Sequence, residues 1–181
     1  MIQNHEIIKR LIQDAFISIP YQTESAHAIL LKENDPQASL SKVYIENVPK
    51  EAVLIHMDQI PPPECLRENY RKRCDYTLVT QDCILFMEMK SSAKTSRENE
   101  IIQQFKGADA VLEFIAAASR NFLGEGSWRT RTRKYIIFVG GVEKRPTKIK
   151  KLATPSSIDS PAYLHVHDRK SITFHELSNR A

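Results

Sequence analysis

Two carboxylates and one lysine in this sequence, Asp75, Glu88 and Lys90, have the types and spacing for metal-dependent chemistry. Asp75 opens one apolar run, Glu88 and Lys90 close the next, and the polar pair Gln81-Asp82 joins the two runs. If this pair is the tip of a two-residue hairpin, Asp75 faces Glu88 across the ladder, with Cβ atoms about 5 Å apart. Lys90 points to the same face, because side chains alternate along a strand. The spacing therefore predicts two acids and one ammonium at one end of a sheet.

Both faces of this predicted hairpin are largely apolar, so its charged groups are removed from water at a high free-energy cost. A hard divalent cation held by oxygen ligands would offset that cost, and Mg²⁺ fits because it uses few protein carboxylates and keeps several waters. A second interpretation makes the three residues a structural set in which Lys90 neutralises one acid. A three-residue turn would also shift the register by one residue and separate the acids. The residue pattern leaves these alternatives open.

The elements that must hold this cluster follow from the spacing of apolar residues. A first helix is predicted after the capping residue Asn4, where apolar side chains recur at helical spacing: Ile7, Ile8, Leu11, Ile12 and Ala15. Thr95 and Glu98 form a Thr-x-x-Glu capping box, which predicts the start of a long helix ending near residue 119. Strands are predicted over residues 43–48, 53–57, 75–80, 83–90 and 134–139, with a C-terminal pair of strands at 163–166 and 172–175.

Length and composition favour one domain over residues 1–181, and the predicted helices and strands make it an α/β domain. The chain is 41% hydrophobic and 27% charged, and no repeat or linker divides it. Its apolar runs are too short to span a membrane, and Cys65, Cys74 and Cys83 are expected to be free thiols. Because the first residues lack the features of a secretory signal, we expect the protein in the cytoplasm.

The residues of the predicted cluster and their setting resemble the core of the PD-(D/E)XK nuclease superfamily. The shared pattern is Asp75, a hairpin turn, Glu88-Met89-Lys90 at the end of an apolar strand, a helix carrying Gln103-Gln104, and a later apolar strand. It covers about residues 74–139, and Cys74 stands where the family has a proline that supplies no ligand. The resemblance implies the restriction-endonuclease-like fold, in which a mixed β-sheet core of order αβββαβ is flanked by helices.

The resemblance also implies a metal-dependent nuclease, and DNA is favoured over RNA as its substrate. The side chains of Asp75 and Glu88, with the backbone carbonyl of Met89, would hold Mg²⁺, for which Mn²⁺ could substitute. Lys90 would position the attacking water and neutralise charge on the phosphate. Phosphodiester hydrolysis needs such groups, because a nucleophile must be generated near neutral pH while negative charge builds on oxygen.

Many members of the superfamily add two further side chains to the metal site. One is a glutamine on the helix after the lysine strand, for which Gln104 is the candidate and Gln103 the alternative. The other is an acid from an early helix, and the choice between Glu6 and Glu24 stays open.

Positive charge is concentrated locally in the sequence. Nine basic residues and one acid lie between residues 127 and 151, although the net charge of the whole chain is only +4. Local fields of this kind bind polyanions by releasing counterions. We expect contacts with a nucleic-acid backbone from six residues: Arg71, Lys72, Arg73, Arg129, Arg131 and Arg133. Since the chain has little room for a separate recognition domain, a homodimer or a partner protein could supply specificity.

Two other classes of function remain open. One is a non-catalytic nucleic-acid-binding or assembly module with a nuclease-like core, which would bind nucleic acid without cutting it. The other is a protein-interaction domain in which Asp75, Glu88 and Lys90 form structural ion pairs and metal does not shift the melting temperature. The intact Glu-x-Lys spacing favours catalysis over both.

Overall fold

The computed structural model describes residues 4–33, 38–91, 98–124, 131–140, 157–166 and 171–180. Three helices, ten strands and two short 3₁₀ helices (Asp14–Phe16 and Glu68–Tyr70) lie in these ranges. The helices are α1 (Asn4–Leu11), α2 (Glu98–Leu123) and α3 (Phe174–Arg180). The strands are β1 (Ile17–Ser18), β2 (Tyr21–Gln22), β3 (His27–Lys32), β4 (Lys42–Glu46), β5 (Val53–His56), β6 (Tyr76–Val79), β7 (Cys83–Lys90), β8 (Thr132–Gly140), β9 (Ala162–Val166) and β10 (Ser171–Thr173).

The strands form two mixed sheets, so the protein is of the mixed α/β class. The larger sheet has six strands in the order β1-β5-β6-β7-β8-β9. Its first four strands pair antiparallel, whereas β7, β8 and β9 run parallel. The helix α2 makes the crossover from β7 to β8, which parallel neighbours require. The smaller sheet has the order β10-β4-β3-β2, and β10 runs parallel to β4.

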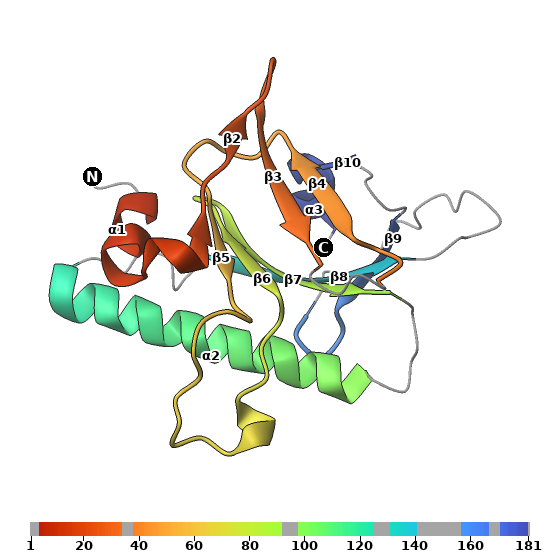
Figure 1. Ribbon diagram of the computed structural model, residues 1–181. Helices are drawn as coiled ribbons and strands as arrows, with labels where there is room; N and C mark the ends of the chain where they lie inside the picture. Colours follow the sequence, from red (N-terminus) through yellow and green to blue (C-terminus); the bar gives the residue numbers. More distant parts are fainter. Residues whose placement is uncertain are drawn as a thin grey trace.

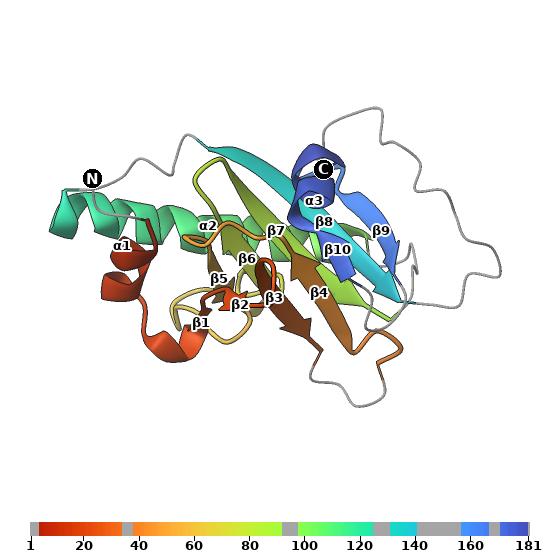
Figure 2. The same ribbon diagram turned by 90° about the horizontal axis from the view of Figure 1, so that it is seen from above.

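The larger sheet lies in the middle layer of the molecule. In Figure 1, α2 runs below it, and β2, β3, β4 and β10 lie above it; Figure 2 shows α3 beside β10 and β8. One core cluster joins α1 and α2 to the lower face, and a second joins the smaller sheet and α3 to the upper face. The expectation of helices flanking a single sheet is therefore corrected, because the upper face is covered mainly by a second sheet. The strand β4 buries alternate side chains, and β3 buries Ile29 and Leu31 together with Ala28, which suits sheet-on-sheet packing.

The helix α2 packs along the lower face through the apolar stripe that its sequence predicts. All five residues of that stripe are buried: Ile101, Phe105, Ala108, Leu112 and Ile115. The described part of α2 begins at Glu98, so the predicted cap Thr95 lies outside the described residues. Within the described part of the chain, no helix combines the length and the apolar character needed to cross a membrane.

Two predicted elements are wrong at their ends. Ala15 lies in a short 3₁₀ helix after α1 ends at Leu11, instead of in the first helix. Residues 172–175 do not form one strand, and β9 and β10 do not pair, because they belong to different sheets. The chain turns into α3 at Phe174 because Thr173 caps it: the Glu176 N–H donates to Thr173 Oγ1 at 3.2 Å, and the Thr173 N–H donates to Glu176 Oε2 at 3.1 Å.

Candidate metal centre

The hairpin of β6 and β7 has the register that a two-residue turn predicts. Leu78 lies opposite Leu85, and the ladder extends to Tyr76 opposite Met87. The Thr80 N–H donates to the Cys83 carbonyl at 3.0 Å, so Thr80 and Cys83 form a hydrogen-bonded pair. Along an antiparallel ladder, hydrogen-bonded pairs alternate with non-hydrogen-bonded pairs. By this alternation, the next residues along the ladder, Asp75 and Glu88, form a non-hydrogen-bonded pair, in which side chains approach most closely.

The backbone and side chains at this end of the hairpin hold the two carboxylates together. The Asp75 N–H donates to Glu88 Oε2 at 3.1 Å, and the Met89 N–H donates to Asp75 Oδ2 at 2.7 Å. Each acid is therefore fixed by the strand that carries the other. The Lys90 ammonium forms an ion pair with Glu88 Oε1. The three groups of the predicted cluster lie on the α2 side of the sheet and in contact with one another.

Burial and mutual repulsion set the protonation of the cluster. Burial raises the pKa of Asp75 well above its usual range, and the Glu88 charge raises it further. Burial also raises the pKa of Glu88, which is 1% exposed, while Lys90 acts against that rise. Burial lowers the pKa of Lys90, but the charges of Glu88 and Asp75 outweigh it and the net shift is upward. Lys90 therefore stays protonated and is the positive charge nearest to both acids, the buried Glu88 and the partly buried Asp75.

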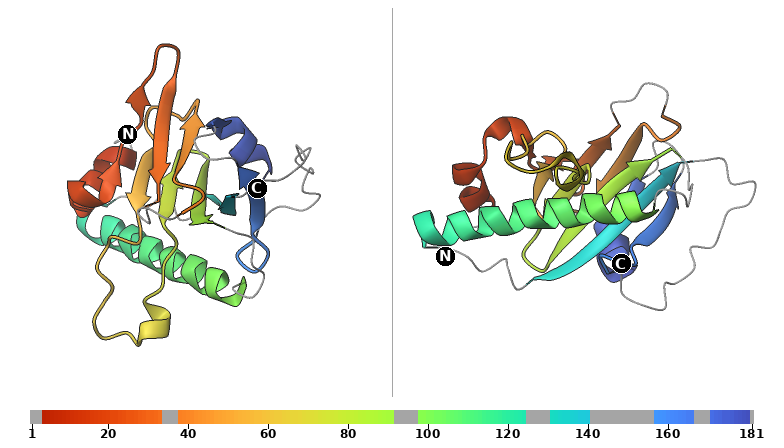
Figure 3. Two further views of the ribbon diagram at one scale, coloured as in Figure 1. Left: turned by 45° about the vertical axis from the view of Figure 1, so that its right-hand side comes forward. Right: turned by 90° about the horizontal axis from the view of Figure 1, so that it is seen from below.

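The segment that leads into Asp75 is held against α2. The Cys74 N–H donates to the backbone carbonyl of Gln104 at 3.1 Å, and on the other side the Met57 N–H donates to the Asp75 carbonyl at 2.9 Å. In Figure 3 the segment between β5 and β6, drawn in yellow, crosses α2. Gly107 permits this approach, since a Cβ atom there would lie 1.9 Å from the Lys72 carbonyl oxygen. The backbone of α2 thus fixes where the first carboxylate enters the sheet.

We expect Gly107→Ala to destabilise the protein by about 1–3 kcal/mol, because the added methyl must displace the Lys72 backbone. Chemical denaturation would measure this change, and Gln103→Ala on the exposed face of α2 serves as the control. Alanine at position 107 would stabilise the protein instead if the close approach to Lys72 were absent, because alanine is the better helix former.

The structure brings Gln104 to the cluster and leaves Gln103 exposed. A side-chain hydrogen bond from Gln104 lowers the pKa of Glu88, although burial dominates that pKa. The same amide lies 3.5 Å from the Arg73 carbonyl oxygen through Nε2. Its Oε1 atom is buried and has no hydrogen-bond partner among the described residues. Gln104 is therefore the glutamine that can orient Glu88.

The donor atoms at the cluster suit a hard divalent cation. The available ligands are carboxylate oxygens, and Mg²⁺ binds through one or two carboxylates and completes its shell with water or phosphate oxygens. In an extended strand, the N–H and the C=O of one residue point to the same edge of the strand. The Met89 N–H points to Asp75, so we expect the Met89 carbonyl to point toward Asp75 as well. Within the described residues, there is no group of three or more His, Cys, Asp or Glu side chains arranged to hold a metal ion.

The two acids that the sequence suggests as further metal ligands, Glu6 and Glu24, do not contribute to the hydrogen bonds and the ion pair that hold the cluster together. Glu6 on α1 and Glu24 in the turn before β3 are both exposed. Instead, the charge of Glu33, at the end of β3, contributes to the raised pKa of Asp75, after burial and Glu88. The sequence offers no signal for Glu33, because its position depends on how the smaller sheet packs on the larger one.

Tyr76 joins the smaller sheet to the larger one near the cluster. Its hydroxyl accepts a hydrogen bond from the Lys32 N–H at 3.1 Å and donates one to the Lys32 carbonyl. Burial raises the pKa of Tyr76 to about 12, so the hydroxyl keeps its proton. This contact holds the end of β3, and with it Glu33, beside β6.

The basic residues before Asp75 make contacts within the protein. Arg71 donates to the backbone carbonyls of Glu64 and Leu66, and Lys72 forms an ion pair with Glu100 at 2.9 Å. Burial lowers the pKa of Arg73, while the nearby charge of Asp58 raises it. These three residues directly precede Cys74 and Asp75, so they lie where they could contact a phosphate group bound at the cluster.

The second basic stretch lies at the opposite end of the sheet. Thr132 pairs with Cys83 and Val139 with Lys90, so Arg131 and Arg133 are about 20 Å from Lys90 along the strands. Arg131 donates to the Thr80 carbonyl. Arg133 is paired with two acids of α2, at 2.7 Å to Asp109 Oδ1 and also to Glu113 Oε1. Arg129 lies outside the described residues, so its predicted role stays a prediction.

The arrangement as a whole places two acids beside a protonated lysine at one end of the sheet. Such a set can stabilise negative charge on an oxyanion, which is the electrostatic requirement of phosphate chemistry. None of the protein-family models, curated proteins or solved structures compared with this chain matches it.

Proposed function

We propose that this chain is a Mg²⁺-dependent nuclease that hydrolyses phosphodiester bonds, with DNA as its substrate. The observation that carries the proposal is that two acids from facing segments, the buried Glu88 and the partly buried Asp75, lie together beside the Lys90 ammonium, which forms an ion pair with Glu88. When both acids are ionised, their two negative charges exceed the single positive charge of Lys90, and a bound divalent cation would offset the excess.

The order of elements supports a restriction-endonuclease-like core. The helix α1 comes first, β5, β6 and β7 then form an antiparallel meander, and α2 leads to β8, which is parallel to β7. This is the αβββαβ order that the family resemblance implies, with β1 to β4 inserted between α1 and β5. Glu88 stands on β7, the third strand of the meander, and Asp75 directly precedes β6, the second; both lie on the α2 side of the sheet.

Each residue of the cluster has a distinct part in the proposed reaction. Asp75 and Glu88 would hold the metal, with the Met89 carbonyl as a further ligand, and Gln104 keeps the Glu88 carboxylate in orientation. A bound Mg²⁺ supplies a Lewis acid and lowers the pKa of its water. Lys90, being protonated, stabilises charge on the phosphate and orients the water, because it has no lone pair with which to act as a base.

An activity screen tests this proposal. Labelled single-stranded, duplex and branched DNA and single-stranded RNA are incubated with the protein, with and without Mg²⁺ or Mn²⁺, and Lys90→Ala serves as the inactive control. We expect metal-dependent cleavage of at least one DNA form by the wild type and none by the variant. Cleavage of no substrate with either metal would contradict the proposal.

We expect Gln104→Ala to reduce the cleavage rate by about tenfold, since partners that orient a metal ligand typically contribute ten- to a hundredfold. Gln103→Ala removes the neighbouring amide from the exposed face of α2 and is the matched control. Single-turnover cleavage rates of the two variants provide the comparison. Equal cleavage rates of the two variants would show that Gln104 does not contribute to the reaction.

The second candidate is a non-catalytic nucleic-acid-binding or assembly module. It is favoured by the intramolecular partners of the basic side chains and by the Lys90–Glu88 ion pair, which would also exist in a purely structural cluster. This candidate predicts that the wild type binds DNA but cuts none of the substrates. Sedimentation of the protein with and without DNA would also reveal whether it acts as a homodimer.

A further inference from the structure

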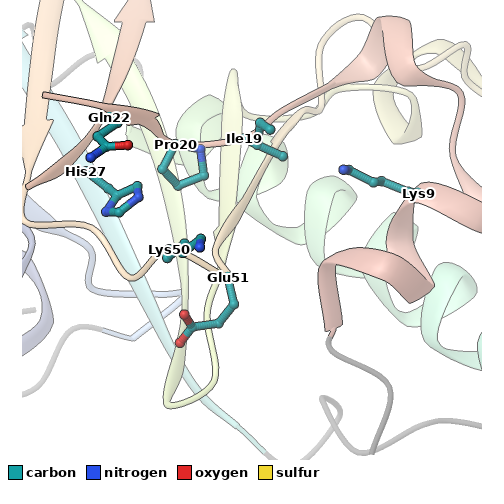
Figure 4. Close-up of a pocket in the computed structure, with 7 residues that line it drawn as sticks. All are labelled: Lys9, Ile19, Pro20, Gln22, His27, Lys50 and Glu51. Carbon is teal, nitrogen blue, oxygen red and sulfur yellow. The ribbon is translucent and has the colours of Figure 1, made fainter.

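A cavity of about 540 Å³ lies away from the carboxylate cluster, between three separate parts of the chain. Its lining comes from α1, from the segment of β2 and β3, and from the turn before β5. The lining residues are Lys9, Ile19, Pro20, Gln22, His27, Lys50 and Glu51. Figure 4 shows Lys9 on α1 pointing toward Ile19 from one side of the cavity, with Lys50 and His27 on the other side. The cavity therefore joins distant segments and presents ammonium groups from two of them.

Two lysines and one glutamate line this cavity, so its described charged side chains carry a net positive charge. Among the described residues, neither Lys9 nor Lys50 forms an ion pair. Glu51 also lines the cavity, but in Figure 4 its carboxylate points toward the lower edge of the view, away from Lys9 and the His27 ring. Unpaired cations facing one concave site concentrate positive potential there and attract anions.

The cavity is too far from the carboxylates to belong to the same site. Lys50 and Glu51 lie before β5 begins at Val53. The Asp75 carbonyl accepts a hydrogen bond from the Met57 N–H, directly after β5 ends at His56. Glu51 and Met57 are six residues apart along this segment, which corresponds to about 20 Å for extended chain. The cavity and the cluster therefore lie at opposite ends of this strand.

We propose that this cavity binds a nucleotide, with its phosphate held between Lys9 and Lys50. The volume lies within the range of small-molecule sites and is several times what a bare phosphate ion needs. Ile19 and Pro20 offer an apolar wall to the sugar or base, and the Gln22 amide can both donate to and accept from a base edge. The ligand is either a free nucleotide or one unit of a nucleic-acid strand.

A second cavity offers a path for a longer strand. It has a volume of about 350 Å³, shares Ile19 with the first, and extends to His56 and Tyr76. Tyr21, which is 45% exposed, also lines it and could stack on an unpaired base. A strand that follows both cavities would bind more tightly than one nucleotide, so strand length distinguishes the two sources of ligand.

Binding assays in EDTA test this proposal without relying on catalysis. Isothermal titration uses three probes: inorganic phosphate, adenosine monophosphate and a ten-residue oligodeoxynucleotide. The double variant Lys9→Gln/Lys50→Gln removes both ammonium groups. The matched control, Arg10→Gln/Arg120→Gln, removes two exposed charges outside the cavity and leaves the net charge equal.

We expect the cavity variant to weaken binding of the nucleotide or the oligonucleotide by at least about tenfold, and the control by less than about twofold. A free nucleotide is the ligand if adenosine monophosphate binds as tightly as the oligonucleotide, and a strand is the ligand if only the oligonucleotide binds. Equal weakening in both variants, no binding of any probe, or equal affinity for inorganic phosphate and the nucleotide would overturn the assignment. Because no metal is present, these outcomes do not depend on nuclease activity.

Discussion

Asp75→Asn is expected to reduce metal-dependent cleavage by about a thousandfold while leaving nucleic-acid binding intact, because the amide removes a metal ligand that carries charge. The asparagine keeps the shape of the side chain and can still accept the hydrogen bond from the Met89 N–H. Cleavage rates and binding affinities measured on the same labelled DNA would test this. Full activity of the variant would exclude Asp75 from metal binding.

The same variant should gain stability relative to the wild type as pH rises. The pKa of Asp75 is raised in the folded protein, so the folded state holds this proton more tightly than the unfolded chain. The stability that the proton contributes is complete below the ordinary carboxyl pKa and is lost as pH rises toward the raised value. Asparagine does not titrate, so the variant avoids this loss. Denaturation at pH 5 and pH 8 without metal measures the effect, and Asp82→Asn in the exposed turn is the control.

Lys90→Met is expected to destabilise the metal-free protein by about 2–3 kcal/mol at pH 8, and to abolish cleavage. Methionine leaves Glu88, which is 1% exposed, without its ion-pair partner and beside a second acid. Lys90 lowers the pKa of Glu88, so its removal raises that pKa further. The loss of stability should therefore shrink at pH 5, where the Glu88 carboxyl can take up a proton.

The control for Lys90→Met is Lys106→Met. Lys106 forms an ion pair with Asp159 at 3.1 Å, but both side chains are well exposed, at 46% and 73%. Exposed pairs contribute at most about 1 kcal/mol, so this variant should show a small change with little dependence on pH. Urea denaturation of both variants at the two pH values gives the comparison. A loss at Lys90 that stays the same at pH 5 would show that the buried acids do not cause it.

The hairpin could be predicted from sequence because its register depends on residues close together in the chain. The alternation of apolar side chains and the two-residue turn at Gln81-Asp82 are enough to predict the register from Tyr76 to Met87, which brings Asp75 beside Glu88. Gln104 follows from the helical period, because the apolar stripe that includes Phe105 faces the sheet and turns one glutamine inward.

The features that depend on contacts between distant segments could not be predicted in this way. The apolar residues of β3 and β4 do not indicate which sheet these strands join. The sequence therefore does not predict the second sheet or the position of Glu33. The pairing of Arg133 with Asp109 and Glu113 depends on how α2 crosses β8. By contrast, Thr173 and Glu176 have the Thr-x-x-Glu spacing of a capping box, a local signal from which the start of α3 could have been predicted.

The most direct test of the shared cation is a crystal of the wild-type protein soaked in Mn²⁺ and measured at the manganese absorption edge. The account predicts an anomalous peak within about 2.3 Å of one oxygen of Asp75 and one oxygen of Glu88, with the Lys90 ammonium displaced from Glu88 Oε1. A map with no peak at these carboxylates, and with the Lys90–Glu88 ion pair unchanged, would contradict it.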